Sequence, residues 1–306
     1  MTTNRIAIVT GRDTRQMVRE VITALGDDFT GLVTRAQRIF IHPNLVSHTR
    51  AENCTQPDAV RGLLDHLQLH RADEMLVGDA GVRSTARAFR KLDFASLRRS
   101  GNIRLMDLNQ DETIETYAYT ARMKKRRIGW AKTVADSDGN IVIVPAKMHH
   151  YFNVTLSIKT QVVGSMIVPA SPFGLHMRWP WVLTGYIPGN RTLADVYQQY
   201  PAQLAIIDGT HAMEGNGPTA GQAVNLEWVI ASLNPVAADA AAAYLMGWEP
   251  HDIGYLHHLD GMGLGPIDIE KLEIIGPVPV TLRRELKKPD SYPATMSWRE
   301  GESGSR

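Results

Sequence analysis

The side chains best suited to chemistry gather in a glycine-rich run between residues 208 and 221. Its polar members are Asp208, His211, Glu214 and Asn216, and Gly217 follows them directly. Carboxylates and an imidazole can transfer protons or bind a divalent metal, and glycines let the backbone approach a ligand closely. Because the spacing fits no standard metal motif, we interpret His211 and Glu214 as acid–base residues and Asn216 and Gly217 as substrate contacts. A metal held by Asp208 and Glu214 is the alternative.

A second group of basic and polar side chains follows an apolar run that ends at Val144. It consists of Lys147, His149, Thr155 and Lys159. A lysine partly shielded from water can bind an anion or, with a lowered pKa, act as a base or a Schiff-base nucleophile. If residues 155–159 are helical, Thr155 and Lys159 share one face. We interpret Lys147 and His149 as catalytic and Thr155 and Lys159 as substrate-binding, with an ordinary solvated loop as the alternative.

Two shorter motifs lie where apolar strands should end. In the first, His42-Pro43-Asn44, the Asn44 amide can both donate to and accept from a carboxylate or phosphate. The second places Asp79 in a glycine-containing turn whose backbone N–H groups could bind an anion at a helix start. This turn lacks the full dinucleotide fingerprint, so NAD is not expected. The plainer interpretations are a strand-ending turn for the first motif and a helix N-cap by Asp79 for the second.

Asp239 is the one charged residue in an otherwise apolar segment that runs from Asn234 to Gly247. The segment is a strong helix signal, with Asn at the N-cap, Pro at the first position and Gly beyond the end. An acid in so apolar a helix is rarely buried without a partner. We predict that Asp239 supports a site lysine or histidine from behind, or alternatively contacts a neighbouring backbone.

Apolar runs alternate with amphipathic segments, which predicts an α/β fold with mixed, largely parallel sheets flanked by helices. We expect strands at residues 5–10, 38–45, 74–78, 102–108, 128–134, 141–144, 204–207 and 271–275, and helices at 13–25, 57–69, 84–92, 154–166 and 234–247.

Residues 1–286 form one expected unit, or two lobes (1–112 plus 200–286, and 113–199) with the site between them. After the expected helix 154–166, an irregular connection runs up to Gly189. It contains Arg178-Trp-Pro-Trp181 and suggests a lid or binding loop. Residues 287–306 are expected to be a polar, frayed tail.

Composition excludes several classes of protein. With 43% hydrophobic and 21% charged residues, the chain is predicted to be folded rather than disordered. A net charge of +1 gives no global attraction to nucleic acid, and we interpret the basic run at residues 124–127 as a solvated turn. The single cysteine, Cys54, cannot form an internal disulfide or ligate an iron–sulfur cluster alone. No stretch matches a signal peptide or a membrane span, so we expect a cytoplasmic protein without a membrane partner.

The chain resembles domain-of-unknown-function family 362 from about Ile39 to Gly276. The resemblance rests on Ile41-His-Pro-Asn-Leu-Val46, Gly78-Asp79, Val144-Pro-Ala-Lys147-Met-His149, Val154-Thr155-Leu-Ser-Ile-Lys159, the run 208–218 and Asn234-Pro-Val-Ala-Ala-Asp239, in family order. His42 replaces the family's usual lysine, Thr160 replaces an asparagine, and the ferredoxin-like cysteines of many relatives are absent. The resemblance therefore implies a shared pocket without an intrinsic iron–sulfur cluster. A looser similarity in motif order to the nickel-cofactor lactate racemase group is an analogy.

These patterns together favour a small-molecule enzyme that applies lysine, histidine and carboxylate acid–base chemistry to a small anionic substrate. Isomerase, racemase, lyase and hydrolase reactions all fit this set of groups, with or without a divalent metal. The alternatives are a non-catalytic protein that binds or matures a metal or cofactor, and an oxidoreductase that depends on a partner. A homo-oligomer is compatible with the sequence, whereas a nucleic-acid partner is not expected.

Overall fold

A large mixed sheet forms the centre of the computed structural model, which describes residues 4–46, 50–71 and 73–301. Its strand order is β13-β1-β12-β10-β7-β2-β3-β4, with β11 paired to β10 and β8 paired to β7. The strands are β1 (Arg5–Thr10), β2 (Ile39–Pro43), β3 (Met75–Asp79), β4 (Ile103–Asp107), β7 (Gly139–His149), β8 (Asn153–Thr155), β10 (Leu204–Glu214), β11 (Gln222–Val224), β12 (Trp228–Ser232) and β13 (Glu273–Ile275). The run from β10 to β4 is parallel, and β12 is antiparallel to both β10 and β1. The predicted α/β class with a mixed, largely parallel sheet is confirmed.

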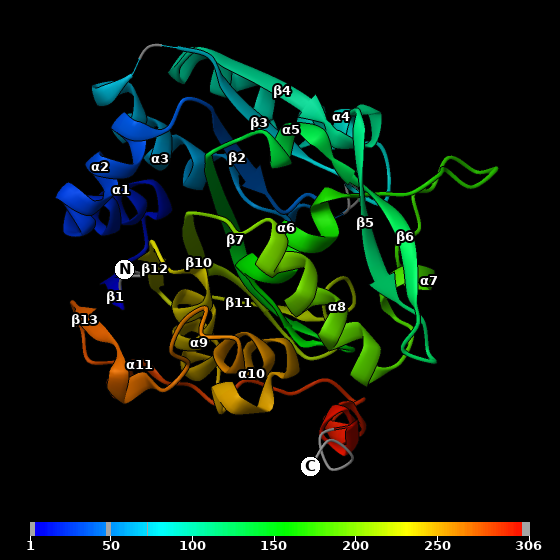
Figure 1. The fold of residues 1–306 in the computed structure, drawn as a ribbon. Coiled ribbons are helices and arrows are strands. Elements are labelled where there is room, and N and C mark those ends of the chain that lie inside the picture. The colour runs from blue at the N-terminus through cyan, green and yellow to red at the C-terminus, as the bar shows by residue number, and fades with distance from the viewer. Residues whose placement is uncertain (1–3, 47–49, 72, 302–306) are drawn as a thin grey trace.

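Helices cover both faces of this sheet (Figure 1). One apolar core packs α1 (Thr14–Leu25), α2 (Asp27–Arg35), α3 (Pro57–His70) and α4 (Thr85–Lys91) against it. The other core contains α6 (Ser157–Ser165), α8 (Tyr186–Gln199), α9 (Pro235–Leu245) and α10 (Gly254–Gly261). Helix α9 begins as predicted, because the Asn234 side chain accepts from the backbone N–H groups of Val236 and Ala237.

A smaller antiparallel sheet lies beside the large one (Figure 1). It contains β5 (Thr113–Tyr119), β6 (Lys125–Ala131) and β9 (Met166–Ile167), and the short helices α5 (Lys132–Ala135), α7 (Trp179–Val182) and α11 (Pro279–Leu282) complete the labelled elements. The expected solvated turn at residues 124–127 is therefore wrong over most of its length. Residues 125–127 begin strand β6, where the ammonium of Lys125 lies over the ring of Tyr117 on the paired strand.

Two local predictions near the site are also corrected. The expected helix at 154–166 begins only at Ser157, because residues 153–155 pair as β8 with the end of β7. Thr155 and Lys159 therefore do not share a helix face. The strand expected at 204–207 is longer than predicted, because β10 continues through the glycine-containing run to Glu214 across an irregularity in register. Pairing with β7 and β11 satisfies its backbone groups despite the glycine.

The sequence indicated a frayed tail over residues 287–306, but the described part of it, up to Gly301, is packed. Residues 302–306 lie outside the described residues. A 3₁₀-helix spans Ala294–Gly301 against α8 and α10, and Trp298 is 1% exposed. The segment is mostly polar, but burial of the large Trp298 indole removes enough apolar area from water to hold it against the protein. Within the described ranges, no helix is both long and apolar enough to cross a bilayer.

Candidate active site

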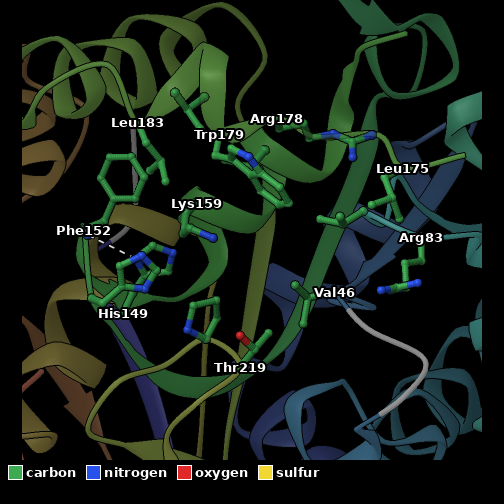
Figure 2. A pocket seen from close by; sticks show the side chains of 15 residues that line it. Val46, Arg83, His149, Phe152, Lys159, Leu175, Arg178, Trp179, Leu183 and Thr219 are labelled. Atoms are coloured by element: carbon green, nitrogen blue, oxygen red, sulfur yellow. Dashed lines mark hydrogen bonds between the residues drawn. The ribbon is translucent and has the colours of Figure 1, made fainter. Parts of the chain in front are cut away.

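A cavity of about 340 Å³ opens beside the first turns of α6, near the carboxyl ends of β2, β3 and β7 (Figure 2). Its polar lining consists of Arg83, His149, His150, Lys159, Arg178 and Thr219. An adjoining recess shares Lys159 and Arg178 with the cavity and reaches Asn44 and Asp79. The carboxyl ends of parallel strands are where α/β folds bind ligands.

The Lys159 amine is directed into this cavity (Figure 2). The side chain is only 8% exposed, and its amine has no hydrogen-bond or salt-bridge partner in the part of the chain that the structure describes. Burial, followed by repulsion from Lys147, lowers the pKa of Lys159 to about 7, while Asp79 acts in the opposite direction. At neutral pH both protonation states of this amine are therefore populated.

Lys147 lies behind the cavity wall and holds Asn44. Its Nζ donates to Asn44 Oδ1 at 2.6 Å and to the backbone carbonyl of Asn53 at 2.7 Å. Burial lowers the pKa of Lys147 to about 8. The amide of Asn44 in turn donates to Thr160 Oγ1 at 3.0 Å, which links strand β2 to helix α6. Thr155 pairs with Lys147 in register, and its hydroxyl is buried without a hydrogen-bond partner among the described residues.

His149 is fixed in one tautomer by the backbone. Its Nδ1 accepts from the N–H groups of Tyr151 at 3.0 Å and Phe152 at 3.2 Å, so the neutral ring carries its hydrogen on Nε2. Burial, with smaller contributions from Lys159 and His150, holds the pKa of His149 well below its usual value. His149 therefore lines the cavity as a neutral imidazole with an N–H to donate.

Asp79 pairs with His42 beneath the recess. Its Oδ1 lies 3.3 Å from His42 Nε2, and its Oδ2 accepts from the backbone N–H of Leu45 at 2.7 Å. The alternative that Asp79 caps the next helix is wrong, because Ser84 is the N-cap of α4. A Cβ on Gly164 of α6 would lie 2.5 Å from both Asp79 Oδ1 and His42 Nε2.

This close approach makes Gly164→Ala a test of the packing. We expect the substitution to cost about 1–3 kcal/mol of unfolding free energy, because neither buried side chain can move without losing its partner. Gly261→Ala is the matched control, since that helical glycine has no atom within 4 Å of the added Cβ. Denaturant unfolding of both variants is the measurement. Equal stabilities would contradict the placement of helix α6 over the Asp79–His42 pair.

Arg178 anchors the segment that closes one side of the cavity. Its guanidinium donates to the carbonyls of Met166, His176 and Gly81 and to Asn109 Oδ1 at 2.5–3.2 Å. The connection that the sequence indicated as a lid or binding loop does line the cavity, through residues 175–183. The fixed charge of Arg178 was missed as a site group, although the unusual Arg-Trp-Pro-Trp run marked its position.

Asp239 lies fully buried under the first turn of α6. Its carboxylate accepts from Ser157 N and Oγ at 2.9 and 2.5 Å, from Ile158 N at 3.1 Å and from Tyr255 OH at 3.2 Å. Burial raises the pKa of Asp239 to about 7, against the opposing effect of these hydrogen bonds. Asp239 thus contacts a neighbouring backbone, and that backbone belongs to the helix that carries Lys159.

The structure does not bring His211 into the same cavity. Thr210, its neighbour, contacts Thr14 of α1, and His211 itself lines a separate hollow with Pro57 of α3. Its Nδ1 lies 3.1 Å from Asp208 Oδ2, and this hydrogen bond raises the pKa of the imidazole. The predicted common hollow therefore contains His149 and Lys159 but not Asp208 or His211.

Glu214, Asn216 and Gly217 hold the chain around the cavity rather than facing it. Glu214 Oε2 accepts from the backbone N–H of Lys287 at 2.9 Å, and Asn216 exchanges two hydrogen bonds with Asp290 at 2.6 and 2.8 Å. The Gly217 carbonyl accepts from the backbone N–H of His150 at 2.9 Å. These contacts position the next two residues, Pro218 and Thr219, which line the cavity.

The arrangement does not favour the predicted metal pair. The Asp208 oxygens accept from Thr210 and His211, while Glu214 is bound to the C-terminal segment. In the ranges that the structure covers, no group of three or more His, Cys, Asp or Glu side chains is placed to hold a metal ion.

Comparison with solved structures shows which known folds are similar. The lactate racemase apoprotein from Thermoanaerobacterium thermosaccharolyticum matches with a TM-score of 0.51 and 12% identity, covering 79% of this chain and 57% of that one. A protein from Thermotoga maritima matches with a TM-score of 0.47 and 12% identity, covering 76% and 59% of the two chains. At this identity the likeness to the lactate racemase apoprotein concerns the fold alone. This chain spans less than two thirds of the length of either structure.

Comparison with curated proteins gives no significant match. The model of one family, described as a domain of unknown function (DUF362), does match residues 39–244. The matched region contains Asn44, Asp79, Lys147, His149 and Lys159. Since it covers more than half of the sequence, the chain belongs to the DUF362 family.

Proposed function

We propose that this chain is an enzyme that performs proton-transfer chemistry on a small molecule bearing a carboxylate or phosphate. The observation that carries the proposal is the Lys159 amine, which is nine-tenths buried, free of partners among the described residues and directed into a cavity. A buried amine without an anion is costly, so such a group favours an anionic ligand or a chemical task.

Charge supports an anionic substrate. Among the residues that the structure describes, the cavity and its recess are lined by the cationic residues Arg83, Lys159 and Arg178 and by one carboxylate, Asp79. Lys147 adds a further buried positive charge behind Asn44. An oxyanion in the cavity would balance this excess and recover part of the desolvation cost of the lysines.

Lys159 and His149 have different tasks in this proposal. With a pKa of about 7, Lys159 can bind the substrate oxyanion as an ammonium near neutral pH, pass its proton to the substrate and take it back. His149 does not compete for that proton, because its Nδ1 is occupied by two backbone donors and its pKa is strongly lowered. Its Nε2–H instead donates to the oxygen on which negative charge develops.

A ligand and isotope screen tests the function directly. Small carboxylates and phosphates should raise the melting temperature of the wild-type protein, whereas their neutral amides and alcohols should not. Substrates among them should exchange carbon-bound hydrogen for deuterium in D₂O, as read by mass spectrometry. If no anion stabilises the protein and none exchanges, the proposal is wrong.

A pair of His149 variants separates catalysis from structure. In His149→Asn, Oδ1 can replace Nδ1 as the acceptor for the Tyr151 and Phe152 N–H groups, but no donor reaches the cavity. We expect turnover to fall roughly 10²–10³-fold with little loss of stability. His149→Gln should retain part of the turnover but lose about 1–3 kcal/mol of stability, because the two backbone donors are left unpaired. Wild-type turnover in His149→Asn would assign His149 a purely structural role.

A further inference from the structure

The walls of the cavity around the Lys159 amine are mainly apolar. Val163, Leu175, Val182 and Leu183 line it together with the rings of Phe152 and Trp179. Figure 2 shows Phe152, Leu183, Trp179 and Leu175 surrounding the space into which Lys159 and His149 point. A site for an inorganic anion or a sugar would instead require polar partners over most of its surface.

Trp179 is the most informative residue of this wall. It remains 42% exposed even though it is a large aromatic side chain on the edge of a formed cavity. The segment that carries it is not loose, because the neighbouring Arg178 donates to carbonyls on two other segments. An exposed indole on an anchored segment beside a cavity is typical of a binding surface for an apolar group.

The polar groups are confined to a small part of the cavity. The guanidinium of Arg178 already donates to backbone carbonyls and to Asn109. It therefore contributes positive charge to the cavity, but few N–H groups for a ligand. Lys159 Nζ and His149 Nε2 are the donors left for a ligand deep in the cavity, and Arg83 lies in an exposed position on its lining. Two converging donors suit one oxyanion. Besides Arg178, the remaining polar side chains of the described lining are Arg83, His150 and Thr219, which lie at exposed positions.

We propose that the ligand is amphipathic, with one oxyanion bound by Lys159 and His149 and an aromatic or branched apolar body packed against residues 175–183. The inference rests on the proposed function and adds the class of substrate. A cavity of about 340 Å³ lies at the small end of ligand pockets, which suits a body of about one ring. Carboxylates and phosphate esters share this chemistry.

Calorimetric titration of the full-length protein with five simple probes tests the inference. Phenylacetate should bind at least roughly tenfold more tightly than acetate, because each buried methylene-sized group is worth about three- to fourfold in affinity. Phenyl phosphate should exceed inorganic phosphate for the same reason. The tighter of the two aromatic anions identifies the head group, and neutral 2-phenylacetamide should bind at least about tenfold more weakly than phenylacetate.

Variants of the wall assign the apolar contact. Trp179→Ala should weaken phenylacetate binding about three- to tenfold while acetate affinity stays within about twofold. Trp179→Phe should recover most of the loss, and Leu183→Ala should reproduce part of it at a second position. The retained acetate affinity shows that each variant is folded with an intact anion end.

The outcomes separate this inference from the proposed function. Equal affinities for acetate and phenylacetate would overturn the amphipathic ligand and leave the anion site in place. Equal affinities for phenylacetate and phenylacetamide would overturn the anion site and leave only the apolar wall. Unchanged phenylacetate affinity in both Trp179→Ala and Leu183→Ala would overturn the assignment of the body to residues 175–183.

Discussion

Lys159→Met is expected to yield a protein that is more stable than the wild type and inactive. Methionine keeps the length of the side chain but removes an amine whose pKa falls from 10.5 to about 7 on folding. At neutral pH this shift opposes folding by an amount on the order of 4 kcal/mol, which the variant would regain. Turnover should fall about 10³-fold or more, because the proton-transferring group is lost. Anions should no longer raise the melting temperature.

The matched control is Lys91→Met, which removes an exposed lysine at the end of helix α4. It should change stability by no more than about 0.5 kcal/mol and leave anion binding intact. Chemical denaturation and the anion screen applied to both variants are the measurements. A destabilised Lys159→Met protein, or one that still responds to anions, would contradict the role assigned to this amine.

The stability difference between the wild type and Lys159→Met should depend on pH. Because Lys159 binds its proton more weakly in the folded chain, the unfolded chain holds more protons between pH 7 and 10.5. The contribution of Lys159 to stability is fully present above pH 10.5 and is lost as the pH falls to about 7. The stability advantage of Lys159→Met should therefore shrink as the pH rises through this window. Anion affinity of the wild type should fall about tenfold per unit above pH 7.

The parallel-strand pattern was sufficient to predict part of the site. Asn44, Asp79 and Lys147 each follow or end an apolar run, and the structure places these runs in the neighbouring parallel strands β2, β3 and β7. Residues at the carboxyl ends of adjacent parallel strands must lie at one edge of the sheet. This rule needs only the strand assignments and their order, which apolar periodicity indicates.

The position of His211 could not be predicted in the same way. His211 lies within β10, where Thr210 and His211 meet α1 and α3. Lys159 lies on α6, and these helices cover opposite faces of the sheet. Choosing the face requires knowing that β10 continues as a strand through the glycine-containing run to Glu214. That continuation depends on pairing with β7 and β11, which are distant in sequence.

The hairpin that orients His149 was missed because its turn carries few of the usual signals. Residues 150–152 contain neither Gly nor Pro, and Asn153, with φ of 66°, is the one residue typical of a left-handed conformation. The same hairpin supplies the two backbone N–H groups that fix the His149 tautomer. Sequence patterns could identify His149 as a candidate, but they could not indicate which of its ring nitrogens carries the hydrogen.

Asp239→Ala should cause the largest loss of stability among these variants. It leaves the buried donors of Ser157, Ile158 and Tyr255 without their acceptor, at a cost of about 2–4 kcal/mol. The stability of Asp239→Asn should lie between those of the wild type and Asp239→Ala, because its amide nitrogen cannot accept a hydrogen bond from a backbone N–H. Glu20→Ala, at an exposed position on α1, is the control and should stay within about 0.5 kcal/mol of the wild type.

The pH dependence of this loss distinguishes a buried carboxyl from a simple packing defect. Burial raises the pKa of Asp239 from 3.8 to about 7, so its contribution to stability is largest below pH 3.8 and decreases as the pH rises to about 7. The stability difference between the wild type and Asp239→Ala should therefore be larger at pH 5 than at pH 8, as measured by denaturant unfolding. Since Asp239 holds the first turn of α6, Asp239→Ala should also weaken anion binding at Lys159. A pH-independent difference with undiminished anion binding would show that Asp239 neither titrates as proposed nor positions Lys159.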